Sequence, residues 1–179
     1  MKRLLKRTEL TLLTLLLGLG LLACSKPEEA PLNLAPVAFH NTDECHVCGM
    51  IITDFPGPKG QALSKRETKK FCSAAEMLGW WLQPENRIGD AKLYVHDMGR
   101  SDWAKPDDNH LIDATQAFYV VDLADSGLSG AMGAVLASFA DEQAARKLAA
   151  IHKSRVMKFA EIDQTVLQKA AAMQHGQAH

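Results

Sequence analysis

The chain has 179 residues and a nearly balanced charge, with 20 Lys and Arg against 21 Asp and Glu. Residues 24–179, which follow a segment typical of an export signal, number 156, enough for one domain or two small ones. They carry a formal net charge of −4 and no basic stripe, which argues against nucleic acid as a partner.

The N-terminal segment has the parts of an export signal. A positively charged stretch precedes the apolar run Leu10–Ala23, whose 14 residues are fewer than the ~20 that span a bilayer. The run ends Leu21-Leu22-Ala23-Cys24, which resembles the lipobox of bacterial lipoproteins. Residues 1–23 are therefore predicted to be a signal peptide, and Cys24 to carry the lipid that holds the chain on a membrane; the alternative is a plain secretory signal that contains a cysteine. Ser25 stands where an Asp would favour inner-membrane retention, so the outer membrane is slightly favoured.

A tether and a first folded unit are expected next. Residues 24–39, rich in Pro, Glu, Ala and Asn, are predicted to be the tether, and residues 40–105 the unit. The elements expected in this unit are, in chain order, a strand at 50–53, a Pro/Gly loop at 55–60, an extended piece at 61–63, a helix from the N-cap Ser73 that ends by Pro84 and Gly89, and a strand at 92–96.

A second unit, residues 106–162, repeats that order. The elements expected in it are a strand at 118–123, a Gly-rich turn at 126–133, a strand at 135–139, a helix that begins at Asp141, and a strand at 155–159. Residues 163–179 are predicted to form a last helix, to about Met173, and a tail. The order β-β-α-β, found twice, predicts an α+β fold with small sheets that are each covered by a helix.

Three cysteines remain once Cys24 carries a lipid, namely Cys45, Cys48 and Cys72. An odd number in an oxidising compartment leaves at least one thiol unpaired, unless a second chain pairs with it. Such a thiol is either buried or functional. Cys72 lies where a strand gives way to a helix and is expected to be a small core residue, whereas Cys45 and Cys48 lie in the polar, turn-like stretch 40–50.

Residues 45–50, Cys-His-Val-Cys-Gly-Met, are the main chemical motif of the chain. Covalent haem is excluded because Gly49 follows Cys48 where a His is required. A thioredoxin-like pair needs a helix N-terminus, but strand-like residues follow here. Structural zinc usually takes its ligands from two paired Cys/His clusters, and a second close cluster is missing, so zinc stays an alternative that is not favoured. Cu(I) fits best, because it is soft and prefers thiolate and thioether ligands.

The methionines supply candidate thioethers for Cu(I). Met50 belongs to the motif, and Met132 lies in the Gly-rich loop 129–133, where a Met has little to pack against. Met98 ends a strand. The remaining methionines, Met77, Met157 and Met173, are explained by core packing.

Four segments, in this order, resemble the nitrous oxide reductase accessory lipoproteins, the NosL family. These segments are Cys48-Gly49-Met50, residues 56–61, residues 94–99, and the glycine-flanked Met132, and the resemblance runs from the lipobox to about Ile162. It implies two ββαβ units similar to the organomercurial lyase fold. It also implies a copper chaperone that binds Cu(I) and passes it, through a membrane complex with an ABC transporter, towards the copper centres of nitrous oxide reductase.

The resemblance also implies a ligand set. The family's Cys-Gly-Met motif falls on Cys48 and Met50, and its loop Met on Met132. Further candidate ligands are Cys45, His46, Met98 and His96. Cys45 departs from the family, because many members have one Cys here, and His96 often aligns with Asn. The hypothesis is therefore a non-enzymatic, periplasm-facing Cu(I) carrier. The alternatives are a periplasmic thiol–disulfide oxidoreductase using Cys45 and Cys48, and a partner-binding lipoprotein in which a Cys45–Cys48 link is structural.

Overall fold

A computed structural model describes residues 34–87, 91–131 and 134–175. The predicted signal peptide, Cys24, most of the predicted tether and Met132 lie outside the described residues. Within the described ranges, no helix has the length and apolar character needed to cross a membrane.

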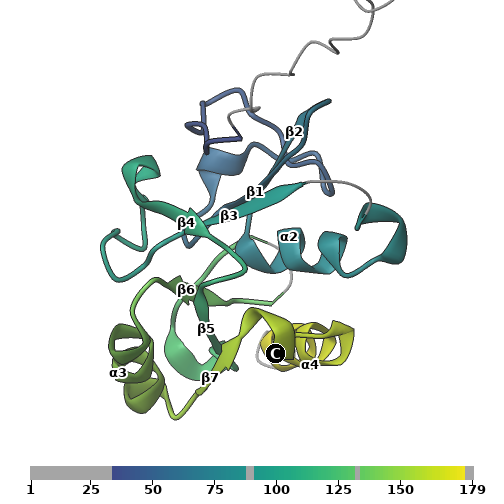
Figure 1. Cartoon of the computed structure of the whole chain (residues 1–179). Helices are drawn as coiled ribbons and strands as arrows, with labels where there is room; N and C mark the ends of the chain where they lie inside the picture. The colour runs from purple at the N-terminus through teal and green to yellow at the C-terminus, as the bar shows by residue number, and fades with distance from the viewer. Residues whose placement is uncertain (1–33, 88–90, 132–133, 176–179) are drawn as a thin grey trace, which may run out of the picture. The chain divides into compact units, whose positions relative to one another are not determined.

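The first sheet has four antiparallel strands in the order β2-β1-β3-β4 (Figure 1). The strands are β1 Gly60–Leu63, β2 Thr68–Phe71, β3 Lys92–His96 and β4 Leu111–Asp113. Helix α2, Ala74–Trp81, follows β2 and packs against β1 and β2. It begins where expected, because the Ser73 hydroxyl caps it by accepting the backbone N–H of Glu76 at 3.1 Å.

The strand expected at residues 50–53 is absent from the described structure. Ile51 forms one isolated bridge with Glu44, and Ile52–Asp54 is a short 3-10 helix. The apolar residues pack this loop against the core instead of forming a strand, since Ile52 is fully buried. The two strands that precede α2 are instead β1 and β2, so the order ββαβ holds with a different first strand.

The second sheet has three antiparallel strands in the order β6-β5-β7. Its strands are β5 Phe118–Val121, β6 Ala137–Phe139 and β7 Arg155–Lys158. Helix α3, Glu142–His152, packs on all three strands; it begins one residue after the expected start, Asp141, which is its N-cap. Helix α4, Gln164–His175, packs against α2 (Figure 1). The α+β prediction is thus confirmed, while the likeness to the organomercurial lyase fold stays a prediction.

The first sheet contains strands from both residue ranges, 40–105 and 106–162, that the sequence predicted to be separate units. Strand β4 lies inside 106–162, yet it pairs with β3, with Val95 opposite Ile112. The end of β3 is also bonded to the second sheet, because Ser138 donates its hydroxyl to the His96 carbonyl at 2.7 Å. These contacts place the two sheets next to each other around the end of β3.

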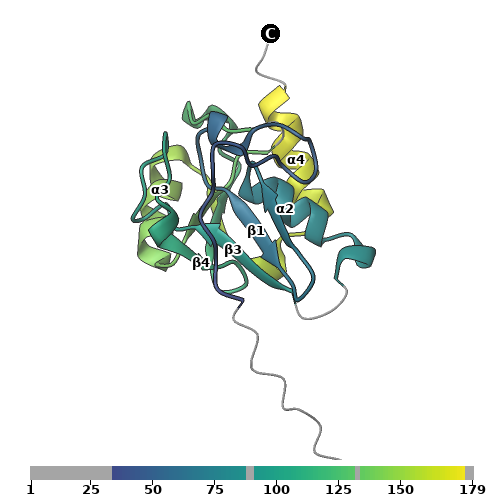
Figure 2. The ribbon, with the colours of Figure 1, turned by 90° about the horizontal axis from the view of Figure 1, so that it is seen from above.

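Residues 34–39, the last part of the range expected for the tether, are bound to the first sheet (Figure 2). The buried side chain of Gln61 accepts the Val37 N–H at 2.9 Å and donates to the Val37 carbonyl at 2.8 Å. The Tyr94 hydroxyl donates to the Leu34 carbonyl at 2.8 Å. These bonds connect the described residues before residue 40 to the first sheet.

Candidate metal centre

The loop of residues 45–50 is a tight turn held against the edge of the first sheet. The Cys45 N–H donates to the Met50 carbonyl at 2.8 Å, and the Gly49 N–H to the Cys45 carbonyl at 2.9 Å. Gly49 has φ +72°, a left-handed conformation that glycine adopts without strain. The His46 N–H donates to the Lys70 carbonyl of β2 at 2.8 Å, which fixes the turn beside the strand.

Cys72 and Glu76 face this turn from the junction of β2 and α2. Cys72 follows β2 directly, and Glu76 lies in the first turn of the helix. Glu76 Oε2 accepts hydrogen bonds from the Cys45 thiol at 2.9 Å and from the Cys72 thiol at 3.1 Å. The Cys48 and Cys72 sulfurs are 3.6 Å apart.

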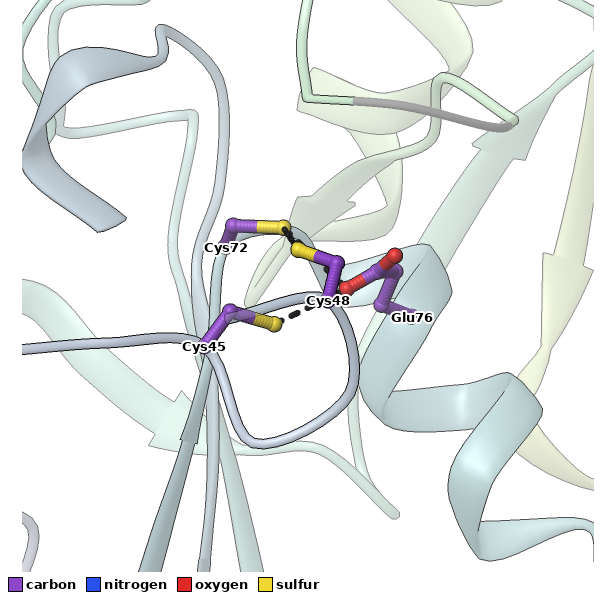
Figure 3. Close-up of side chains that lie close together, drawn as sticks. All are labelled: Cys45, Cys48, Cys72 and Glu76. Carbon is purple, nitrogen blue, oxygen red and sulfur yellow. Dashed lines mark hydrogen bonds between the residues drawn. The ribbon is translucent and has the colours of Figure 1, made fainter. Parts of the chain in front are cut away.

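These four side chains form one cluster (Figure 3), which we call the thiol cluster: Cys45, Cys48, Cys72 and Glu76. Their ligand atoms all lie within 4.8 Å of one another. All three thiols are free. Cys45 and Cys72 are buried and Cys48 is half-buried, so Cys48 is the sulfur nearest to solvent.

The cluster distributes its protons unevenly. Hydrogen bonding with Cys72 lowers the pKa of the Cys45 thiol to about 4. The same contact with Cys45, together with burial, raises the pKa of the Cys72 thiol. Burial raises the pKa of Glu76 to about 7 and also raises the pKa of Cys48. Cys45 is therefore the first thiol of the cluster to ionise, and the cluster presents a thiolate ligand before the other thiols lose their protons.

The geometry around Cys45 and Cys48 differs from that of a thioredoxin-like pair. Both residues lie on a turn, whereas the residue beside a helix N-terminus is Cys72. The Cys45-x-x-Cys48 motif therefore does not itself open a helix, as the motif of a thioredoxin-like dithiol enzyme does.

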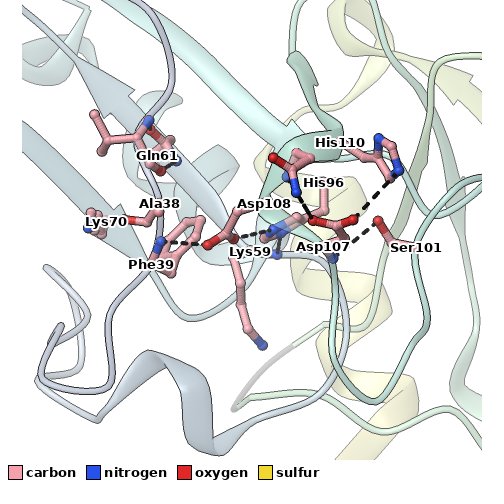
Figure 4. Close-up of polar contacts among 12 residues, drawn as sticks. Ala38, Phe39, Lys59, Gln61, Lys70, His96, Ser101, Asp107, Asp108 and His110 are labelled. Atoms are coloured by element: carbon pink, nitrogen blue, oxygen red, sulfur yellow. Dashed lines mark hydrogen bonds and ion pairs between the residues drawn. The ribbon is translucent and has the colours of Figure 1, made fainter.

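The other residues singled out from the sequence fall into three groups: those on the turn itself, those apart from the thiol cluster, and Met132, which lies outside the described residues. The His96 ring is buried and uses both nitrogens (Figure 4): Nδ1 accepts the Lys59 N–H at 3.0 Å, and Nε2 bonds Asp108 Oδ1 at 3.0 Å. Burial lowers the pKa of His96. With no free nitrogen, His96 is a structural residue here rather than a ready metal ligand.

The positions of the remaining candidates are as follows. Met98 is partly buried and packs against the core of the second sheet. The His46 ring is exposed and stands edge-on against Phe71 and Trp80, at 6.0 and 5.9 Å between centroids. Met50 is half-buried on the cluster's own turn, and Met132 lies outside the described residues.

Sequence reasoning missed two members of the cluster. Cys72 is fully buried, as expected, but its thiol faces other metal-ligating groups instead of only apolar atoms. Glu76 was not predicted to be a ligand. A signal that could have found both is the N-cap Ser73 between them, because the residue before an N-cap and a residue in the first helical turn lie at the same end of the helix.

Comparisons with known proteins give a consistent result. A family model described as NosL matches residues 36–167. The "Copper-binding lipoprotein NosL" of Stutzerimonas stutzeri is 69% identical over 169 residues, which cover 94% of this chain and 87% of the relative. A protein of the same name from Achromobacter cycloclastes is 33% identical over 147 residues, which cover 80% of this chain and 76% of the relative. The crystal structure of the copper chaperone NosL from Shewanella denitrificans superposes with a TM-score of 0.65 at 39% identity, over 73% of this chain and 97% of that one.

Proposed function

This chain belongs to the NosL family, and on that premise we propose that it is a carrier of Cu(I) in the cell envelope and has no catalytic activity. The observation that supports this function is the thiol cluster, three free cysteines whose ligand atoms gather within 4.8 Å. Thiolates are the ligands that Cu(I) prefers, and Cu(I) accepts a small number of them without strict geometry. Relatives that are named copper-binding or copper chaperone support the same conclusion.

The proposed copper ligands are the Cys48 thiolate and the thioethers of Met50 and Met132. Cys48 is the more exposed sulfur of the cluster, which suits a ligand that must receive a metal and give it up. Met50 lies two residues away on the same turn. Met132 would bring a third soft ligand from the loop before β6, so that copper would link segments from the two halves of the chain.

Anaerobic titration of the reduced protein with Cu(I), against a chromophoric chelator, tests this function. We expect one tightly bound Cu(I) per chain, and binding at least tenfold weaker in Met132→Ala, because that variant loses one of three soft ligands. Met173→Ala, on α4, is the matched control and should bind as the parent does. X-ray absorption should show one sulfur fewer around copper in Met132→Ala alone; an unchanged copper shell would remove Met132 from the site.

The same preparation tests the competing thiol–disulfide hypothesis. Reduction of insulin disulfides by the copper-free protein, dependent on Cys45 and Cys48, would favour that enzyme. The turn geometry of the two cysteines argues against it.

The site of action that we propose is the periplasmic side of the envelope, with the outer membrane favoured over the inner. Residues 1–23 would be removed and Cys24 would carry the lipid. From there the protein would hand copper, through a complex that contains an ABC transporter, to nitrous oxide reductase. Copper-poor nitrous oxide reductase in cells that make only the Cys48→Ala variant would support this delivery route, and normally loaded reductase would contradict it.

The lipid anchor has its own test. Cys24→Ser removes the sulfur that accepts the lipid, so we expect a soluble or uncleaved protein that takes up no labelled palmitate. The variant and the parent are compared by membrane fractionation. Continued membrane association with palmitate incorporation would show that another residue carries the anchor.

A further inference from the structure

Two of the three free thiols are in contact across the thiol cluster. The Cys48 and Cys72 sulfurs lie 3.6 Å apart, one on the turn and the other at the junction of β2 and α2. A disulfide bond holds its sulfurs ~2.05 Å apart, so these two need to approach by about 1.5 Å. We propose that Cys48 and Cys72 form a redox pair, which a disulfide-containing molecule oxidises to a disulfide and a thiol reductant restores. This pairing does not rest on the proposed copper function.

The pair combines a sulfur that an oxidant can reach with one that it cannot. Cys48 is half-buried, and its neighbour Val47 is 54% exposed, so the tip of the turn is open to another molecule. Cys72 is fully buried behind it. Figure 3 shows the Cys48 sulfur beside the Cys72 sulfur, with the bond between them drawn as a dashed line. An oxidant therefore meets Cys48 first, and Cys72 is placed to attack next.

Cys45 is the thiol that stays out of the pair. Its sulfur donates to Glu76 Oε2 at 2.9 Å and is hydrogen-bonded by the backbone amides of Cys48 and Cys72. The low pKa of Cys45 makes it the first thiol to ionise, but exchange with a disulfide also requires access, and Cys45 is buried. Three thiols leave one unpaired, and the geometry assigns that place to Cys45 rather than to Cys72.

The chemistry is two successive thiol–disulfide exchanges. In the first, the Cys48 sulfur attacks the disulfide of the oxidant; a mixed disulfide forms, the bond in the oxidant breaks, and one of its sulfurs leaves with the Cys48 proton. In the second, the Cys72 sulfur attacks the Cys48 sulfur; the Cys48–Cys72 bond forms, and the second sulfur of the oxidant leaves with the Cys72 proton. Two electrons pass to the oxidant, whose disulfide becomes two thiols. The chain is thus a substrate of exchange and not its catalyst.

Oxidation of this pair would close the metal site. A sulfur in a disulfide is no longer a thiolate, so the oxidised chain loses Cys48 as a ligand. This consequence, unlike the pairing, rests on the proposed copper function. Copper loading would then have to follow a reduction step, in which a thiol reductant supplies two electrons. Cu(I) on Cys48 would in turn block the first exchange, because the attacking sulfur would be occupied.

The experiment exposes the reduced, metal-free lipoprotein in detergent to glutathione disulfide, alkylates the remaining thiols, and maps the peptides by mass spectrometry. We expect the parent protein to lose two hydrogens, with the Cys48 peptide linked to the Cys72 peptide and Cys45 alkylated. Cys45→Ala is the matched control and should form the same link at a rate within threefold of the parent. Cys72→Ala should stop at the first exchange and accumulate one glutathione on Cys48.

Two results would overturn the redox pair. One is a link between Cys45 and Cys48 in the parent protein. The other is an intramolecular disulfide in Cys72→Ala that forms as fast as in the parent, because Cys72 would then not be the resolving thiol.

The copper function fails in a different way from the redox pair. The oxidised parent should bind Cu(I) at least a hundredfold more weakly than the reduced parent, and should regain its affinity after reduction with a phosphine. Absence of tight Cu(I) binding in the reduced protein, with the Cys48–Cys72 link still formed by glutathione disulfide, would overturn the copper carrier and leave the redox pair standing. Equal Cu(I) affinity of the two forms would remove Cys48 from the copper site.

Discussion

Replacing Cys48 by alanine is expected to weaken Cu(I) binding at least a hundredfold, which is about 2.7 kcal/mol of binding free energy. The reason is the loss of the most exposed thiolate of the cluster, the one that shares a turn with Met50. Competition with a Cu(I) chelator under anaerobic conditions measures the change.

Cys72→Ala is the control for that result. Cys72 is fully buried, so its truncation should lower the free energy of unfolding by about 1 kcal/mol. Its sulfur lies 3.6 Å from that of Cys48, so copper binding should weaken by no more than about tenfold, the smaller loss expected of a neighbouring group rather than a principal ligand. Equal losses of copper affinity in the two variants would mean that the cluster binds copper as a unit, and would contradict Cys48 as the principal ligand.

Gly60→Ala is expected to destabilise the fold by about 1–3 kcal/mol. Gly60 opens β1 where the strand backbone lies directly on α2. A Cβ atom at this position would lie 2.7 Å from Met77 Cβ and 2.8 Å from Met77 Sδ. Met77 is fully buried, so the helix itself must move, and the neighbouring Glu76 must move with it. Chemical denaturation of the metal-free protein measures the loss.

Gly79→Ala is the matched control, on the helix that Gly60 touches. A Cβ at Gly79 would meet only Leu167 Cδ1, at an ordinary 3.7 Å. Alanine is also the better helix former by about 0.8–1 kcal/mol, so this variant should be as stable as the parent or more so. Two glycine-to-alanine changes on either side of one contact should thus have opposite signs. Equal stability of Gly60→Ala and the parent would show that β1 and α2 are not packed backbone to side chain at this point.

The elements that the sequence predicts well are those whose causes are local. Ser73 caps α2 as expected, and α3 begins within one residue of the expected Asp141, which caps it, because capping needs only a side-chain oxygen and the N–H three residues on. The alternating strands β3 and β5 were likewise expected. The run at 50–53 was not predicted correctly, because its apolar residues are buried by loop packing and not by a sheet. Strand β4 has three residues and exists through its pairing with β3.

The candidate site shows the same division. The motif at residues 45–50 was identified from the sequence because its ligands are close in the chain. Cys72 and Glu76 join it only when the turn docks on β2, through the bond from the His46 N–H to the Lys70 carbonyl. His96 has the right chemistry for a ligand, but Lys59 and Asp108 already bind both of its nitrogens. Periodicity and spacing do not report such long-range contacts.

If Cys24 carries the proposed lipid, the binding of residues 34–39 to the first sheet limits how far the domain can lie from the membrane. Ten residues, 24–33, would then separate the lipid from Leu34. Ten extended residues span at most about 35 Å, so Leu34 could lie no farther than that from the lipid anchor. Within that distance, the tether would raise the local concentration of the bound metal beside an acceptor protein in the same membrane. Transfer to a more distant acceptor would need lateral diffusion of the lipid. The six docked residues would thus shorten the tether. Metal transfer would then require the carrier and its acceptor to meet by diffusion within the same membrane.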